Sequence, residues 1–234
     1  IQKKLVEENP DDSTSELHMA MTMLNLGSLE YDEQRYEVAV KTLEETRVIG
    51  DRLLAEHAGD LNVQLFSAET AHFLGRCHRA VNKPELALKE IQNAASIFDG
   101  IVRQQPDDVR SHEKLSGAWA DIAHLHFDAR KRDEVEAAWE TCLKHSRLAQ
   151  TKAPQVAIFR IHLARRLSSR AHQRCSWGDL EPALVDLTHA RDLLPKDAEY
   201  SYATALSLAD FVTALDTSKD PLPDEVTARR GAVI

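Results

Sequence analysis

Apolar residues recur along this chain at three- and four-residue steps, the pattern of amphipathic α-helices. One stripe contains Leu61, Leu65, Ala68, Ala71, Leu74 and Gly75. A second stripe contains Leu86, Ala87, Ile91, Ala94, Ala95 and Phe98. Asn82 and Pro84 lie between them, so we expect Asn82 to be the N-cap and Pro84 to stand in the first turn of the second helix. The pattern predicts two helices joined by a short turn.

The same pattern returns every 48 residues. Two columns of small residues keep this step, Ala39, Ala87, Val135 and Ala183, and Gly27, Gly75, Ala123 and Ala171. A column of large apolar residues keeps it too, Leu43, Ile91, Trp139 and Leu187. A fixed period of this size indicates stacked helical repeats. Antiparallel helices approach closely where one side presents Gly or Ala, so a long side chain there would overpack the pair at about 1–3 kcal/mol.

The period predicts the organisation of the chain. Four repeats are expected at residues 11–58, 59–106, 107–154 and 155–202. Helices outside the second repeat are expected at Leu17–Tyr31, Tyr36–His57, Val109–Ala129, Glu134–Lys152, Gln155–Cys175 and Leu180–Leu194. Residues 1–9 match the end of a preceding second helix, and 197–216 predict a helix that caps the open end. The solenoid thus covers 1–216, and 217–234 are a tail or the start of a further helix.

Composition narrows the class of protein. Apolar residues make up 43% and charged residues 29% of the 234, which suits a folded core. The net charge of −9 is concentrated in residues 11–58, with 11 acids and 4 bases. This balance argues against nucleic-acid binding. No apolar run reaches membrane-spanning length, so membrane insertion is not expected.

Three cysteines, Cys77, Cys142 and Cys175, lack paired spacing and favour a reducing compartment. We therefore expect a cytoplasmic location, with the extracytoplasmic side of a membrane-anchored parent as the alternative. Because the chain begins with Ile1 rather than Met, we interpret it as a piece of a longer protein.

The columns resemble the tetratricopeptide repeat (TPR). The residues that carry the resemblance are Ala71, Leu74, Gly75, Ala87, Ile91 and Ala94, then Trp119, Ile122, Ala123, Val135, Trp139 and Cys142, and finally Ala190 and Pro195. The resemblance implies an all-α, right-handed solenoid of antiparallel helix pairs that binds a protein or peptide. The TPR unit usually has 34 residues, so each helix here is about seven residues longer.

Long repeats of this kind look like those that follow the catalytic domain of large multidomain bacterial serine/threonine protein kinases. Residues 131–139 and Pro106-Asp107-Asp108 prompt this comparison. The chain itself has no Gly-rich phosphate loop, His-Arg-Asp or Asp-Phe-Gly. The resemblance implies a non-catalytic segment that recruits or regulates within a signalling protein.

In the TPR family the first helices of successive repeats line a concave groove. Aligned on the Gly/Ala column, the groove positions are basic and aromatic in the middle of the chain. The candidate partner-binding residues are Tyr31, His72, Arg76, Arg79, His124, Phe127, Arg165 and His172, and Met21 and Leu24 belong to the same set. Arg76 and Arg79 could pair bidentately with a carboxylate or phosphate of an acidic partner. The alternative is a solvated face whose charges bind nothing specific.

Arg166, Arg170 and Arg174 form a secondary basic stripe at four-residue steps. Arg170 stands in a column that is apolar in the other repeats, so it needs a partner or a route to water. Ion pairing with Asp186 or Asp210 is one interpretation, and an anionic ligand or a neighbouring domain is the other.

The remaining chemistry is sparse. His124 and His126 diverge on a helix, and His172 and Cys175 lack further ligands at suitable spacing, so we expect no metal and no cofactor. The favoured function is a protein- or peptide-binding scaffold. The alternative is self-association or docking within the parent, through the acidic first repeat and the arginines of the fourth, which would give a homo-oligomer. An enzyme with an unobvious site ranks last.

Overall fold

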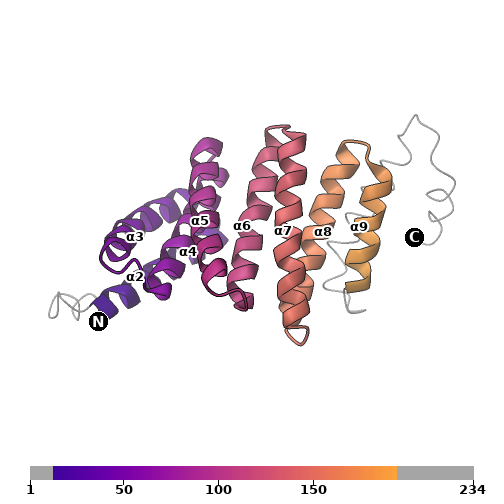
Figure 1. Cartoon of the computed structure of the whole chain (residues 1–234). Coiled ribbons are helices and arrows are strands. Elements are labelled where there is room, and N and C mark those ends of the chain that lie inside the picture. The colour runs from indigo at the N-terminus through magenta and orange to yellow at the C-terminus, as the bar shows by residue number, and fades with distance from the viewer. Residues whose placement is uncertain (1–12, 194–234) are drawn as a thin grey trace. The chain divides into compact units, whose positions relative to one another are not determined.

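The computed structural model describes residues 13–193, and this part of the chain is built of α-helices joined by short turns (Figure 1). Helices that open a repeat are here termed first helices: α2 (Ser13–Asp32), α4 (Leu61–Ala80), α6 (Val109–Asp128) and α8 (Ala157–Ser176). Their partners are the second helices: α3 (Tyr36–Glu56), α5 (Pro84–Gln104), α7 (Arg132–Lys152) and α9 (Leu180–Leu193). No β-strand occurs in residues 13–193, and the expected all-α class is confirmed.

The helices keep the 48-residue register that the sequence predicts. First helices begin at residues 13, 61, 109 and 157, and second helices begin at 36, 84, 132 and 180. Each first helix has 20 residues, and α3, α5 and α7 have 21 residues each. The expected end of a preceding helix (1–9), the capping helix (197–216) and the tail (217–234) lie outside the described residues.

The chain forms two compact units, residues 1–138 and 139–234. In the first unit α2 packs on α3, α3 on α4, α4 on α5 and α5 on α6. Its core includes Ala20, Leu24, Ala39, Leu43, Phe66, Leu74 and Cys77. In the second unit α8 packs on α9, and its core includes Leu143, Leu163, Ala164, Leu167 and Ala190.

Helices of a pair approach closely at the small-residue columns. A Cβ atom added to Gly75 would lie 2.5 Å from Cγ1 of Ile91 and 3.0 Å from the carbonyl oxygen of Ala87. A Cβ atom on Gly27 would lie 2.7 Å from the side chain of Leu43. The spacing of these two pairs is therefore set by the absence of a side chain on the first helix.

Each first helix ends in the same Schellman motif, which needs one residue in the left-handed region. That residue is Gln34, Asn82, Arg130 or Gly178, with φ of 61°, 57°, 57° and 82° respectively. The backbone N–H of the next residue donates to a carbonyl five positions earlier, at 2.8–2.9 Å in all four turns. The turn is thus a repeated element, like the helices that it joins.

The expectation that Asn82 is an N-cap is wrong. Asn82 is the left-handed residue of its turn, and Lys83 occupies the N-cap position without a side-chain hydrogen bond. The reason is that asparagine tolerates positive φ better than other non-glycine residues, and the Schellman motif requires such a residue here. Side-chain caps occur instead at the opposite turns, where Asp60 and Asp108 accept backbone N–H groups of α4 and α6.

We predict that Gly75→Ala lowers the free energy of unfolding by about 1–3 kcal/mol, because the new methyl group meets Ile91 and the backbone of Ala87. The matched control is Gly100→Ala in α5, where no atom beyond the chain neighbours and the backbone of the same helix lies within 4 Å of the added Cβ. This control should be neutral or stabilising by up to about 1 kcal/mol. Urea unfolding followed by circular dichroism measures both, and equal stabilities of the two variants would contradict the close approach.

We also predict that Gln34→Gly stabilises the protein by about 0.5–1 kcal/mol, because glycine adopts positive φ without a Cβ penalty. The matched change Gln92→Gly, at an exposed position inside α5, should destabilise it by a similar amount. Thermal unfolding of the two variants should therefore shift Tm in opposite directions. A fall in Tm for both would mean that Gln34 is not strained.

Candidate functional site

The first helices of the first unit surround a hollow of about 420 Å³. Its lining residues come from α2, α4, α5 and α6: Tyr31, Arg76, Arg79, Ala80, Ile91, Asp121 and His124. Four of the eight predicted groove residues, Tyr31, Arg76, Arg79 and His124, thus line one hollow. The basic and aromatic character expected for this face is present there.

Arg76 is held by aromatic rings rather than by an acid. Its guanidinium carbon lies 4.6 Å from the ring centroid of Tyr31 and 5.4 Å from that of Phe73. Within residues 13–193 its guanidinium has no hydrogen bond or ion pair. Cation–π contacts of this kind contribute about 0.5–1 kcal/mol at exposed sites and leave the N–H donors available. Arg76 therefore presents a positioned positive charge beside the hollow.

His72 and Asp121 form the polar contact next to Arg76. Nε2 of His72 lies 2.7 Å from a carboxylate oxygen of Asp121, whose side chain is 24% exposed. Burial opposes ionisation of Asp121, but the hydrogen bond and charge of His72, with the charges of Arg76 and His124, hold the pKa of that carboxyl below its ordinary value. The carboxylate of Asp121 is therefore already engaged by His72.

Arg79, unlike Arg76, has an acidic partner, but the pair is exposed to solvent. Its Nε and Nη2 donate to the same oxygen of Asp128 at 3.2 and 2.9 Å. The side chains of Arg79 and Asp128 are 38% and 53% exposed, and exposed pairs contribute little because solvent screens them. A ligand acid could therefore replace Asp128 at small cost.

The other predicted groove residues are distributed differently. Phe127 is half-buried on α6 and is not a lining residue of this hollow. Arg165 and His172 lie exposed on α8, which belongs to the second unit. The hollow is thus formed by residues of the first three repeats.

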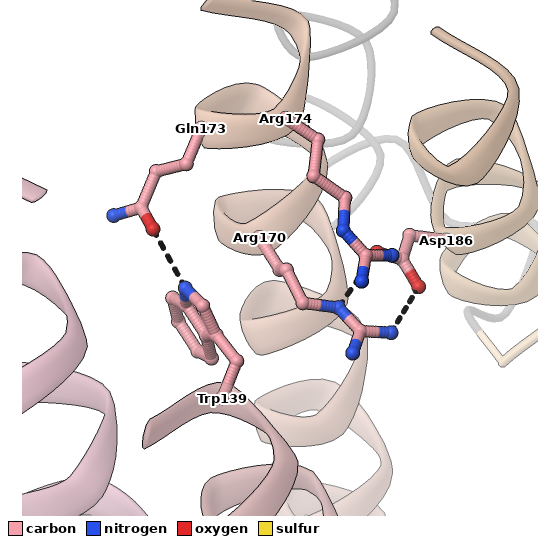
Figure 2. Close-up of polar contacts among 5 residues, drawn as sticks. All are labelled: Trp139, Arg170, Gln173, Arg174 and Asp186. Atoms are coloured by element: carbon pink, nitrogen blue, oxygen red, sulfur yellow. Dashed lines mark hydrogen bonds and ion pairs between the residues drawn. The ribbon is translucent and has the colours of Figure 1, made fainter. Parts of the chain in front are cut away.

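The secondary basic stripe is bound inside the second unit (Figure 2). Arg170 donates to both oxygens of Asp186, from Nε at 2.8 Å and from Nη2 at 2.5 Å, and Arg174 donates at 2.9 Å. Arg166 donates to the hydroxyl of Ser146 at 2.7 Å. Asp186, which is only 2% exposed, is one of the two acids that the sequence analysis names as possible partners of this stripe. The other, Asp210, lies outside the described residues.

The same region buries a second polar contact, between Trp139 and Gln173 (Figure 2). The indole N–H of Trp139 donates to the side-chain oxygen of Gln173 at 2.6 Å, and both residues are at most 1% exposed. Trp139 is therefore a core residue whose polar atom is satisfied, as the repeat column indicates.

Sequence reasoning missed two parts of the site. Asp121 and Phe73 lie next to Arg76, but they stand outside the columns chosen by alignment on Gly75. It also missed most of the residues around a second hollow of about 510 Å³, which α2, the end of α3 and the start of α4 line. Met21 and Leu24 of that hollow belong to the predicted groove set, whereas Leu17 and Leu65, which stand four residues before Met21 and Glu69, do not.

The described residues offer little else that is reactive. Burial raises the pKa of the Cys77 thiol to about 11, so this cysteine is a poor nucleophile. Residues 13–193 contain no cluster of three or more His, Cys, Asp or Glu residues that could hold a metal ion. None of the helices in this range combines the length and apolar character needed to cross a bilayer.

Comparison with known proteins gives the fold and nothing finer. No family model and no curated protein matches the chain. The solved structure of BtubC (BKLC) from P. vanneervenii aligns with 99% of this chain and 86% of its own, with a TM-score of 0.62 and 14% identity. TTC0263, a thermophilic TPR protein from Thermus thermophilus, aligns with 92% of this chain and 98% of its own, with a TM-score of 0.44 and 20% identity. Together with the likeness to BtubC, the regular helix pairs show that the described part of the chain has an all-α fold of repeated antiparallel helix pairs.

We predict that Asp186→Ala destabilises the second unit by about 3–5 kcal/mol, because it leaves Arg170 and Arg174 without their shared acid. The third repeat has Ile122, His126 and Ala138 at the corresponding positions. The triple variant Arg170→Ile/Arg174→His/Asp186→Ala should therefore recover most of the loss. Urea unfolding measures both variants, and a triple variant no more stable than Asp186→Ala would show that the loss is not caused by uncompensated charge.

Proposed function

We propose that the first-helix face of α2, α4 and α6 binds an acidic peptide or protein segment and performs no catalysis. The observation that carries this proposal is the state of Arg76. Its guanidinium is stacked on Tyr31 and has no ion pair with a described residue, and it borders a hollow large enough for a side chain. A carboxylate or phosphate can accept two parallel hydrogen bonds from such a group.

The arrangement lowers two costs of binding. Stacking restricts Arg76 before the ligand arrives, so less side-chain entropy is lost on association. Arg79 lies three residues further along α4, and its exposed pair with Asp128 can be exchanged for a ligand acid. The hollow therefore suits an anion better than a cation, even though the whole chain has a net charge of −9.

The role of the whole protein is a second part of the proposal. The kinase-like stretches at residues 131–139 and at Pro106 support a recruitment or regulatory segment of a larger bacterial signalling protein, such as a serine/threonine kinase. A Gly-rich loop and a catalytic Asp encoded before Ile1 would support this parentage. The cytoplasmic location stays a prediction.

Self-association stays the alternative, with less support. It relies on contact between the acidic first repeat and the arginine stripe of the fourth. Arg170 and Arg174 are engaged by Asp186 inside their own helix pair, and their side chains are only 12% and 16% exposed. These two arginines are therefore poorly placed to meet another molecule.

The test is selection of a phage-displayed library of random 12-residue peptides on the folded chain. Wild type should enrich acidic sequences, and Arg76→Glu should reduce that enrichment at least about tenfold, since removing a desolvated charge-assisted contact costs more than about 1.4 kcal/mol. Lys89→Glu, the same charge reversal at an exposed position on α5, is the matched control and should bind like wild type. Equal enrichment of acidic peptides by wild type and Arg76→Glu would overturn the proposal.

A further inference from the structure

A hollow lined by α2, the end of α3 and the start of α4, here termed the apolar hollow for the side chains at its floor, is left unused by the proposed function. Its volume is about 510 Å³, and its apolar lining residues are Leu17, Met21, Leu24, Leu53, Val63, Leu65 and Phe66. Polar residues complete the lining: Thr14, His18, His57, Asp60, Asn62 and Glu69. Met21 is 45% exposed there, whereas Leu24 is 5% exposed and forms the floor with the core. An exposed methionine over a buried leucine is a surface that a large apolar side chain can cover.

This hollow and the hollow beside Arg76 open on the same faces of the same two helices. On α2, positions 17, 21, 24 and 31 follow steps of three, four and seven residues, which keep one face of a helix. On α4, positions 65, 69, 76 and 79 do the same. One ligand lying along the first-helix face can therefore reach both hollows.

The distance between the hollows fixes the length of such a ligand. From Met21 to Tyr31 on α2, and from Leu65 to Arg76 on α4, the helix rise gives about 15–17 Å. An extended peptide advances about 3.3 Å per residue, so residues four to six positions apart span this distance.

The charged residues along the first helices indicate at which end of this face a ligand carboxylate would bind. Near the apolar hollow, Glu69 is paired with Lys114 at 2.9 Å, and Asp60 accepts backbone N–H groups at the start of α4. Glu69 and Asp60 would repel a ligand carboxylate over the first half of α4, whereas Arg76 and Arg79 would attract it near the end of that helix. Asp121 lines the hollow beside Arg76, but its carboxylate is already paired with His72.

We infer that the ligand of this face is an extended peptide with two anchors: a large apolar side chain in the hollow at Met21, and an acidic side chain four to six residues away on Arg76. The inference rests on the proposed function and adds the second anchor and the spacing. Neither anchor determines the direction of the peptide backbone, so the peptide can run either way along this face.

The experiment uses synthetic 12-residue Gly/Ser peptides that contain one Leu and one Asp, separated by two, four, five, six or nine positions, in both orders. Binding to the full chain is measured by fluorescence anisotropy. Affinity should be highest at separations of four to six and about tenfold weaker at two and nine, because only one anchor is then engaged. Replacing Leu by Ser in the best peptide should cost about the same factor.

Variants of the protein assign the anchors. Met21→Glu should weaken the best peptide about tenfold but leave a peptide with Asp alone unaffected, while Arg76→Glu should weaken both. Leu86→Glu on α5 is the matched control, because Leu86 is 44% exposed, close to the 45% of Met21. Circular dichroism confirms the fold of each variant, and the Leu→Ser peptide tests the apolar anchor without changing the protein.

The outcomes separate the two proposals. If acidic peptides bind through Arg76 but with the same affinity at every separation, and Met21→Glu has no effect, the two-anchor inference is wrong and the proposed function stands. If neither these peptides nor those selected from the library depend on Arg76, both are wrong.

Discussion

The close approach of first and second helices at the glycine and alanine columns is the constraint on which the structure depends. With 2.5 Å between Ile91 and the place where a Cβ of Gly75 would be, the helix pair has one tight separation rather than a range. The remaining column residues Ala39, Ala87, Ala123, Val135, Ala171 and Ala183 are fully buried. Equal pairs, joined by equal Schellman turns, give helices whose starts differ by 48 residues throughout the described range.

This regularity determines which side chains meet between first helices of adjacent repeats in the first unit. The contacts of His72 with Asp121 and of Arg79 with Asp128 join residues 49 apart. Those of Tyr31 with Arg76 and of Glu69 with Lys114 join residues 45 apart. The two separations differ by four residues, about one helical turn, so each side chain faces two neighbours on the next first helix. Arg76 lies 45 residues from both Tyr31 and Asp121, and the hollow forms where these three repeats meet.

The sequence predicts the helices and their register well, because helix periodicity and small-residue columns are local or strictly periodic signals. The expectation for Asn82 is wrong because asparagine is favoured both at an N-cap and at a left-handed turn position, and only the backbone distinguishes the two. The column alignment also predicts that Arg76 and Arg79 share one face of the first helices, and both line one hollow. It does not predict that Arg76 contacts an aromatic ring whereas Arg79 pairs with a carboxylate, because both contacts are made by residues of other repeats. Asp121 was missed for the same reason.

Arg170 and Arg174 differ from Arg76 in the groups that surround their guanidinium, and this difference determines whether the guanidinium can bind a ligand acid. Asp186 is 3% exposed in its side chain and serves Arg170 and Arg174 together, so a ligand that drew either arginine away would leave charge buried without compensation, at a cost of several kcal/mol. The rings of Tyr31 and Phe73 hold Arg76 in place but cannot neutralise it. Nor does Asp121 complete an ion pair with it, because that carboxylate is already bound by His72. Arg76 therefore keeps both its charge and its N–H donors, and an incoming acid need not break a buried ion pair to reach them.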